Sequence, residues 1–139
     1  MDLNDKKVQK LLTDFPTYVD YVWDCIGLPN ATPIQRDVAR TLQEGNKRLL
    51  IQAFRGVGKT YISGAYASWR LLRDPNEKIL IVSASGPHAV AISTFVKKLI
   101  AEVPILEHLK PRGDQRDSVM AFDVDGCKSA VQASVKCLG

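Results

Sequence analysis

The feature that most constrains this chain is a short loop, Gly56-Val57-Gly58-Lys59-Thr60, between an apolar run and a helical pattern. Residues 48–53 before it predict a buried strand, and residues 61–72 after it predict a helix. Glycines let the backbone of such a loop turn its N–H groups toward phosphate oxygens. The lysine adds a positive charge, and the threonine hydroxyl can bind Mg²⁺. The loop therefore predicts phosphate binding; the alternative is a chance turn with a solvated Lys59.

The loop departs from the usual phosphate-loop pattern, GxxxxGK followed by Ser or Thr, at its first position. Ala53 stands there instead of glycine, and alanine is still small enough for a tight exit from a strand. Arg55 lies inside the loop, where it could contact the terminal phosphate, contact a neighbouring subunit or sense the nucleotide; the alternative is an arginine facing solvent. We expect nucleotide contacts from Arg55, Gly56, Val57, Gly58, Lys59 and Thr60, with Lys59 and Arg55 as catalytic candidates and Thr60 as the Mg²⁺ ligand.

The rest of the chain predicts helices and strands in alternation. Hydrophobic spacing predicts helices at 5–15, 17–26, 33–44, 88–103 and 106–110. A second buried strand is expected at 78–83, and β-leaning segments at 118–124 and 129–138 flank an Asp-Gly turn. Strand, helix, strand and helix in this order predict an α/β fold with a parallel sheet.

Gln35 is a candidate for the base of a nucleotide. It lies near the start of the helix predicted at 33–44, 24 residues before Lys59. Its carboxamide offers donors and an acceptor, as the edge of adenine does. The alternative is an ordinary polar residue on the outer face of an amphipathic helix. The phosphate loop downstream favours the adenine contact.

Two other groups of side chains have competing interpretations. Asp123 follows an apolar run and could bind Mg²⁺, but Gly126 predicts a turn, so a carboxylate at the end of a hairpin is the better interpretation. Basic residues could follow a DNA backbone, or they could simply form a solvated surface. These basic residues are Lys97, Lys98, Lys110, Arg112 and Arg116.

Composition excludes several classes of protein. The chain has 139 residues, of which 45% are hydrophobic and 24% charged, and its formal net charge is +4. These values are ordinary for soluble globular domains and exclude collagen-like and low-complexity chains. No apolar run is long enough to span a membrane, and the polar N-terminus is unlike a secretory signal. Composition therefore predicts a soluble intracellular domain and goes no further.

The motifs taken together resemble a known family. Pro33-Ile34-Gln35, residues 49–53, residues 55–60 and Ile81-Val82-Ser83-Ala84-Ser85 are similar to the N-terminal ATPase half of bacteriophage large terminase subunits, above all the DNA maturase B type of T7-like podoviruses. An arginine in the loop without a leading glycine is typical of that family. The similarity runs through the whole chain.

The resemblance implies a P-loop NTPase fold of the RecA or helicase type, with a parallel sheet and flanking helices. It also implies an N-terminal helical extension and a β-hairpin near the C-terminus. We expect residues 1–45 to form the helices that carry the adenine-contacting glutamine. Residues 46–139 are expected to form part of the ATPase domain, which would be incomplete.

The resemblance also implies a function. Members of the family are ATP-driven motors that translocate double-stranded DNA into procapsids, with ATP and Mg²⁺ as cofactors. In this chain it implies Gln35 as the adenine contact, Arg55 as the nucleotide-sensing arginine, and residues 83–85 as the segment that couples nucleotide state to DNA. The family motor is a homo-oligomeric ring in the host cell cytoplasm, bound to no membrane. Its partners are the portal protein, the small terminase subunit and viral DNA.

The acidic residues that activate water, and the carboxylates of the family's nuclease domain, are expected downstream of Gly139. We therefore expect this chain to bind ATP at best. Two alternatives stay open: a nucleotide-binding, catalytically incomplete truncated product, and a helicase-like ATPase of another system.

Overall fold

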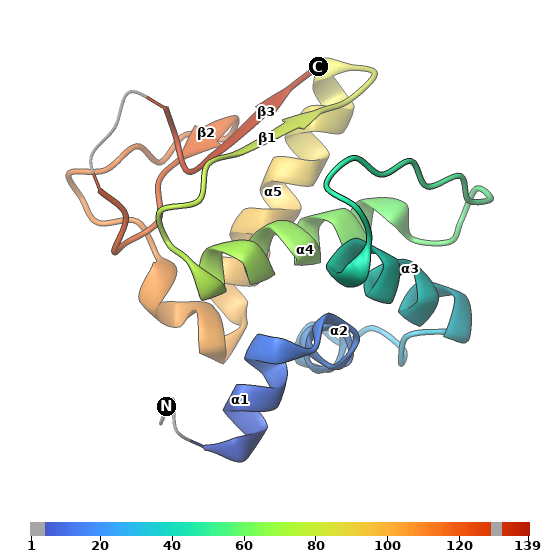
Figure 1. The fold of residues 1–139 in the computed structure, drawn as a ribbon. Helices are drawn as coiled ribbons and strands as arrows, with labels where there is room; N and C mark the ends of the chain where they lie inside the picture. Colours follow the sequence, from blue (N-terminus) through green and yellow to red (C-terminus); the bar gives the residue numbers. More distant parts are fainter. Residues whose placement is uncertain (1–4, 129–131) are drawn as a thin grey trace.

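The computed structural model describes residues 5–128 and 132–139. These ranges contain five α-helices, one 3-10 helix and three strands (Figure 1). The helices are α1 (Lys6–Thr13), α2 (Phe15–Cys25), α3 (Pro33–Glu44), α4 (Lys59–Arg73), α5 (Gly86–Glu102) and the 3-10 helix η1 (Pro104–Leu109). The strands are β1 (Ile79–Val82), β2 (Ala121–Phe122) and β3 (Val135–Leu138). The protein is thus a mixed α/β structure with a small sheet, as the sequence predicted in outline.

Side chains that accept hydrogen bonds from backbone N–H groups set the starts of most helices. Asp5 and Asp14 cap α1 and α2, and Ser85 caps α5. Thr32 begins α3 in a full capping box, in which its hydroxyl accepts from the backbone of Gln35 and the Gln35 side chain accepts from the backbone of Thr32. The predicted helices are confirmed, with boundaries that shift by a few residues.

The sheet has the order β1-β3-β2. β1 and β3 are parallel, with Ile79 opposite Val135, and β2 runs antiparallel to β3. The chain passes from β1 to β3 by way of α5, η1 and β2. The antiparallel pairing of the segments around Asp125-Gly126 is confirmed, while residues 129–131 of the second predicted segment lie outside the described residues.

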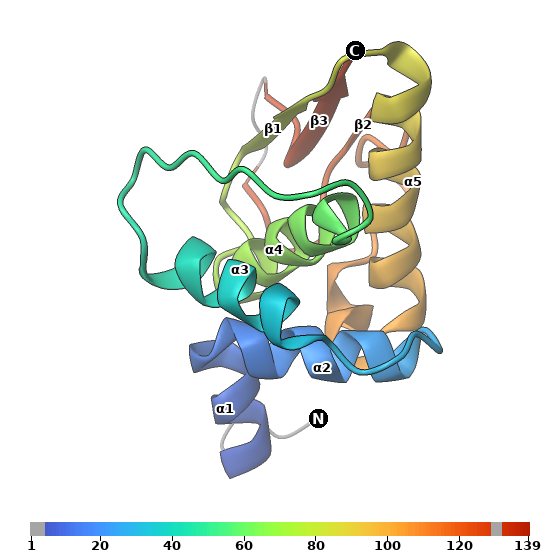
Figure 2. The same cartoon turned by 90° about the vertical axis from the view of Figure 1, so that its right-hand side faces the viewer.

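One predicted strand is wrong. Residues 48–53 form no strand; they belong to a long loop that passes over α4 (Figure 2). Leu50 is 83% exposed and Leu49 is also exposed. A segment becomes a strand only where a neighbour completes its hydrogen bonds, and the described sheet offers this segment no pairing. The parallel partner of β1 is therefore β3, near the end of the chain, rather than residues 48–53.

The second strand was also predicted to be buried, but one of its faces is only half-buried and the other is exposed. Ile79 and Ile81 face the helices, whereas Leu80 and Val82 are exposed on the other face. Val135 and Cys137 of β3 are fully buried on the helix side. The helices thus cover one face of the sheet and leave the opposite face open (Figures 1 and 2).

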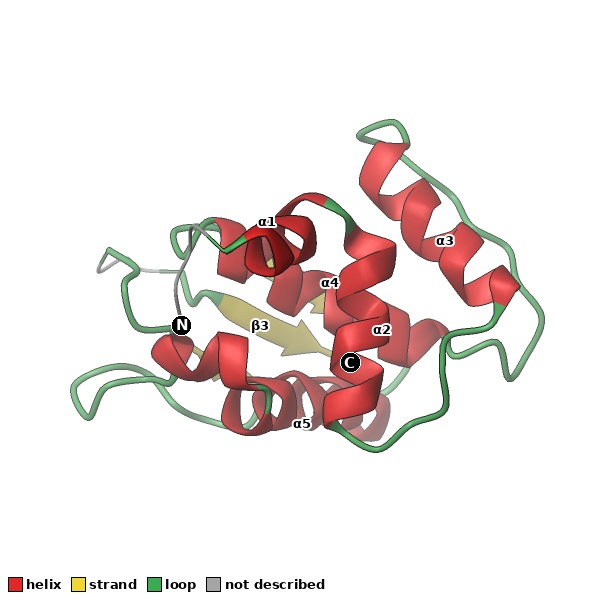
Figure 3. Cartoon of the chain, turned by 90° about the horizontal axis from the view of Figure 1, so that it is seen from below, coloured by secondary structure: helices red, strands yellow, loops and turns green. Residues whose placement is uncertain are grey.

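The core connects the N-terminal helices to the rest of the chain. α4 packs between α5 and the pair α2 and α3, as the view from below shows (Figure 3). The buried Tyr18 hydroxyl of α2 is hydrogen-bonded to Ser68 of α4 at 2.8 Å, and Trp69 donates its indole N–H to the Leu11 carbonyl at 2.9 Å. One continuous apolar cluster therefore includes residues on both sides of position 45. The division into 1–45 and 46–139 stays a prediction.

No helix among the described residues is long and apolar enough to cross a membrane.

Candidate nucleotide site

The predicted phosphate loop leads directly into α4. Gly56 and Gly58 both have positive φ angles, of 94° and 91°, a conformation that side-chain-bearing residues rarely adopt. Between them Val57 is buried and donates its backbone N–H to the Phe54 carbonyl at 3.4 Å. The buried valine anchors a loop whose two neighbouring glycines turn the backbone sharply.

The N-terminus of α4 differs from those of the other described α-helices. Its N-cap is Gly58, and no side chain accepts a hydrogen bond from its first turn. Asp5, Asp14, Thr32 and Ser85 perform that task for α1, α2, α3 and α5. The first N–H groups of a helix have no partner within the helix, and its dipole favours a negative charge there. The N–H groups at the start of α4 are therefore available to an anion.

Lys59 folds back over the loop. Its Nζ donates to the Ala53 carbonyl at 3.0 Å, so the ammonium group spans the loop from its last residues to its first. Ala53 stands at the position where the usual pattern has glycine. If the loop held a phosphate group, the Lys59 ammonium could exchange its hydrogen bond to the Ala53 carbonyl for one to a phosphate oxygen. The bond to phosphate is the stronger of the two, because both of its partners are charged.

Gln35 reaches the loop from α3. Its Nε2 donates to the Val57 carbonyl at 2.8 Å, and its Oε1 accepts from the Thr32 backbone at 3.1 Å. A β-carbon at Gly58 would lie 3.0 Å from this Nε2, so glycine also leaves room for the glutamine. A carboxamide has two N–H donors and two lone pairs, so one of each remains for another partner. The structure thus joins Gln35, the residue predicted to contact adenine, to Val57 of the predicted phosphate loop, 22 residues later in the sequence.

Thr60 lies beside a residue that the sequence did not single out. Its Oγ1 is 3.4 Å from His88 Nε2, in the first turn of α5. Both residues line a cavity of about 690 Å³ between α4 and α5, which Lys98 also lines. The Ser85-Gly86-Pro87 helix start places His88 in the first turn of α5, but no local pattern in the sequence shows that this turn lies beside Thr60.

The segment after β1 is held close to the end of β3. The backbone N–H of Ser83 donates to the Leu138 carbonyl at 2.8 Å, and the Ser83 hydroxyl donates to the Ser85 carbonyl at 2.9 Å. Ser85 then caps α5 through His88. Residues 83–85 thus connect the sheet to the helix that carries His88.

Arg55 is exposed, and within the described ranges it has no hydrogen-bond or ion-pair partner. Its neighbour Phe54 is 60% exposed. A guanidinium group in this position can meet a ligand or another molecule without first breaking an internal contact.

Asp123 is bound to Arg116. The carboxylate accepts from Arg116 Nε at 3.1 Å and from a second guanidinium nitrogen at 3.2 Å, and the backbone N–H of Ser134 reaches it at 3.3 Å. Burial by itself raises the pKa of Asp123, but the hydrogen bonds from Arg116 and Ser134 outweigh it and hold the pKa below its ordinary value. This geometry agrees with the interpretation of Asp123 as a structural carboxylate.

The site offers more groups to the phosphates of ATP than to Mg²⁺. The glycine turns, the uncapped helix and Lys59 suit the phosphates. For the metal, Thr60 offers one hydroxyl, and no group of three or more His, Cys, Asp or Glu residues gathers anywhere within residues 5–128 and 132–139. Mg²⁺ commonly keeps several waters and takes ligands from nucleotide phosphates, so one protein ligand is compatible with a nucleotide-bound ion.

Three of the five basic residues considered for DNA contact are in ion pairs. Lys97 lies 2.6 Å from Asp117, Arg112 lies 3.4 Å from Asp125, and Arg116 is paired with Asp123. These cations are partly neutralised by their own neighbours. The structure does not assemble the five residues into one unpaired basic surface.

Comparison with known proteins identifies a relative. The terminase large subunit of Enterobacteria phage T3 is 45% identical to this chain over 133 residues, which are 95% of the chain. The chain is a relative of a phage large terminase subunit. The match spans 23% of the length of the phage T3 protein. No family model matches the chain. The resemblance to large terminases predicted from the motifs is confirmed.

Proposed function

We propose that this chain forms the nucleotide-binding part of a phage DNA-packaging motor. In this proposal residues 55–60 hold the phosphates of ATP, and Gln35 contacts the adenine base. The observation that carries it is the uncapped start of α4 behind two glycines with positive φ, with the Lys59 ammonium folded over the same loop. The relation to a large terminase subunit supports the same conclusion independently.

Each residue of the proposed nucleotide site has its own role. The N–H groups at the start of α4 bind the phosphate oxygens, and Lys59 neutralises the β- and γ-phosphates. Thr60 would hold Mg²⁺, which when bound would neutralise further phosphate charge. Arg55, exposed and without a partner among the described residues, contacts the terminal phosphate and so senses whether ATP or its product is bound. Gln35 transmits changes in the loop to α3 through its bond to Val57.

The fold and the wider assembly belong to the proposal as well. We infer a P-loop NTPase domain of the RecA or helicase type, of which residues 46–139 are a part and residues 1–45 the helical extension. The motor would translocate double-stranded DNA into procapsids in the host cytoplasm, as a homo-oligomeric ring on the portal protein, with the small terminase subunit as partner. Residues 83–85 would couple the nucleotide to DNA, because they lie between the sheet and the helix that contacts Thr60.

The test is ATP binding by the 139-residue chain and by Lys59→Ala, measured by calorimetry with Mg²⁺ present. We expect the wild type to bind and the variant to lose about tenfold or more in affinity, because a charged hydrogen bond to phosphate is lost. Lys6→Ala is the matched control, since Lys6 is an exposed lysine of α1, outside the loop. Equal affinities for wild type and Lys59→Ala would refute the assignment of the phosphate loop.

Hydrolysis is tested in the same samples by phosphate release. We expect no release above background, because Asp123, the local carboxylate candidate, is bound to Arg116. Rapid turnover by the wild type that Asp123→Asn abolished, while circular dichroism showed the variant still folded, would instead make Asp123 catalytic.

A further inference from the structure

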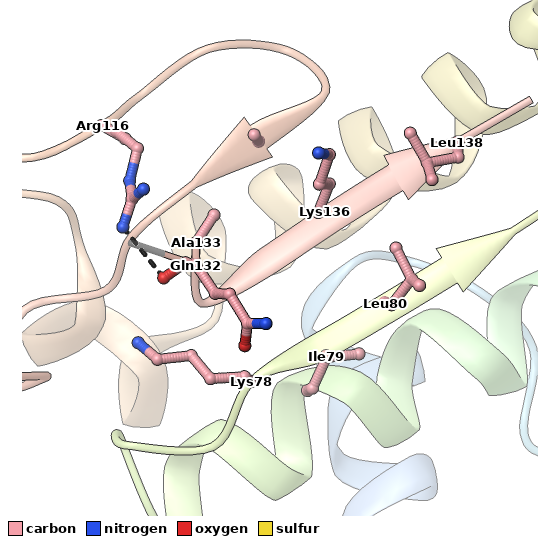
Figure 4. A pocket seen from close by; sticks show the side chains of 9 residues that line it. Lys78, Ile79, Leu80, Arg116, Gln132, Ala133, Lys136 and Leu138 are labelled. Atoms are coloured by element: carbon pink, nitrogen blue, oxygen red, sulfur yellow. Dashed lines mark hydrogen bonds between the residues drawn. The ribbon is translucent and has the colours of Figure 1, made fainter. Parts of the chain in front are cut away.

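A cavity lined by basic side chains lies on the face of the sheet that the helices leave open (Figure 4). Its volume is about 440 Å³. Side chains from β1, β3 and the segments beside them line it; they are Lys78, Ile79, Leu80, Arg116, Ala121, Gln132, Ala133, Lys136 and Leu138. None of the phosphate-loop residues is among them. The cavity is therefore separate from the proposed nucleotide site.

Lys78 is the unusual member of this group. Its Nζ atom is buried, and in the part of the chain that the structure describes it has no hydrogen-bond partner. An ammonium group loses its hydration when it is buried, and without a partner it has nothing in exchange. Buried lysines are normally paired with an anion. The lone Lys78 ammonium thus indicates that an anion binds beside it.

The surroundings of Lys78 are positively charged. Lys136 projects from β3 on the open face of the sheet and is exposed, and the lining residues include no Asp or Glu. Arg116 lies at the same cavity, where it donates to the Gln132 carbonyl at 2.9 Å (Figure 4). The Arg116 charge is already balanced by Asp123, so the two lysines carry the uncompensated charge.

We propose that this cavity, which Lys78 and Lys136 both line, binds a phosphate-class oxyanion. The two lysines supply the charge, and Gln132, which also lines the cavity, has a side-chain carboxamide that can donate a neutral hydrogen bond. The phosphate can be a free phosphate group or a phosphodiester of a DNA backbone, because both present the same oxygens. The proposal does not depend on the nucleotide site.

The test uses inorganic phosphate as the probe and follows amide shifts of the folded chain by NMR. Chloride at matched ionic strength serves as the reference, so that general screening is subtracted. All samples carry Lys59→Ala, which removes the charge of the other proposed phosphate site. We expect saturable shifts at the amides of Leu80 and Lys136. We expect the dissociation constant to rise about tenfold or more in Lys78→Met, because a charge-assisted hydrogen bond is lost.

Two further variants make the result decisive. Lys136→Gln alters an exposed residue and so tests the cavity even if Lys78→Met fails to fold. Lys6→Met removes a lysine of α1 and is expected to leave phosphate binding unchanged. Unchanged phosphate affinity in Lys136→Gln, or shifts that lie outside the cavity, would overturn the proposal.

A short duplex DNA then distinguishes the two sources of phosphate. If the duplex displaces inorganic phosphate from the cavity and binds Lys136→Gln more weakly than the Lys59→Ala parent, the ligand is a backbone phosphodiester. If phosphate binds and the duplex does not compete, the cavity takes free phosphate groups. Both results support the oxyanion site, and absence of binding by both probes would refute it.

Discussion

At the scale of single residues, one glutamine connects the start of α3 to the predicted phosphate loop. Gln35 completes the capping box of α3 and at the same time holds the Val57 carbonyl of the phosphate loop. The pattern of the sequence indicated a nucleotide contact at Gln35, and the capping role follows from Thr32 three residues earlier. The bond to Val57 could not be predicted, because it depends on how closely α3 approaches the loop.

The ion pair between Asp123 and Arg116 predicts a dependence of stability on pH. The folded-state pKa of Asp123 lies below the ordinary value of 3.8. Its contribution to stability is therefore fully present above pH 3.8 and is lost as the pH falls through the lower, folded-state value. We expect Asp123→Asn to lower the free energy of unfolding by about 1–3 kcal/mol at pH 7, because Arg116 and Ser134 lose a charged acceptor.

Urea unfolding at pH 7 and at pH 3 measures this effect. The difference between Asp123→Asn and the wild type should be smaller at pH 3, because below the ordinary carboxyl pKa of 3.8 the unfolded chain is mostly protonated at this position and must lose that proton on folding. Asp117→Asn is the control, because Asp117 is exposed in its pair with Lys97 and should cost less than about 1 kcal/mol. Equal losses in the two variants would contradict a structural role specific to Asp123.

At the scale of elements, the helices were more predictable than the strands. Helix ends are set by nearby residues, as Thr32, Pro33 and Gly45 show for α3. A strand depends on a partner that can lie far along the chain, as β1 depends on β3, which begins 56 residues after it. The apolar run at 48–53 was therefore assigned as a strand on local evidence that could not reveal whether a partner was present.

The exposed loop at 48–53 makes a prediction about stability. We expect Leu50→Ser to change the free energy of unfolding by no more than about 0.5 kcal/mol, because the Leu50 side chain is already in solvent. Leu71→Ala in α4 is the contrasting variant; it should cost about 2–5 kcal/mol, because Leu71 is fully buried. Chemical denaturation measures both. A loss above about 2 kcal/mol for Leu50→Ser would mean that this segment is buried in solution.

At the scale of the whole molecule, α4 is the element on which the rest is assembled. It packs against α1, α2, α3, α5 and η1, and its first turn forms part of the candidate site. Buried aromatic side chains fill the space between α4 and the N-terminal helices, including Phe15 and Trp69 with ring centroids 5.1 Å apart. The phosphate loop is thereby fixed to the same core as the helices that precede it.

This shared core predicts one cooperative unfolding transition. Trp23 reports on α2 and Trp69 reports on α4, so Trp69→Phe and Trp23→Phe each leave one fluorescent probe. We expect the fluorescence midpoint of each variant in urea to coincide with its own midpoint by circular dichroism, because α2 and α4 are buried against each other. An earlier transition for Trp23 alone would instead support residues 1–45 as a separately folding unit.

The sequence by itself determined the helices and the turns, and it predicts the kind of chemistry at the loop. Those features depend on residues close together along the chain: caps, glycines that permit positive φ, and a lysine and threonine at the start of a helix. The tertiary structure alone decided which strands pair, that His88 lies beside Thr60, and that Asp123 is bound to Arg116. It alone buried the Lys78 ammonium nitrogen without a hydrogen-bond partner among the described residues. Burial and pairing arise from contacts between segments, and the order of segments along the chain does not specify the distances between them.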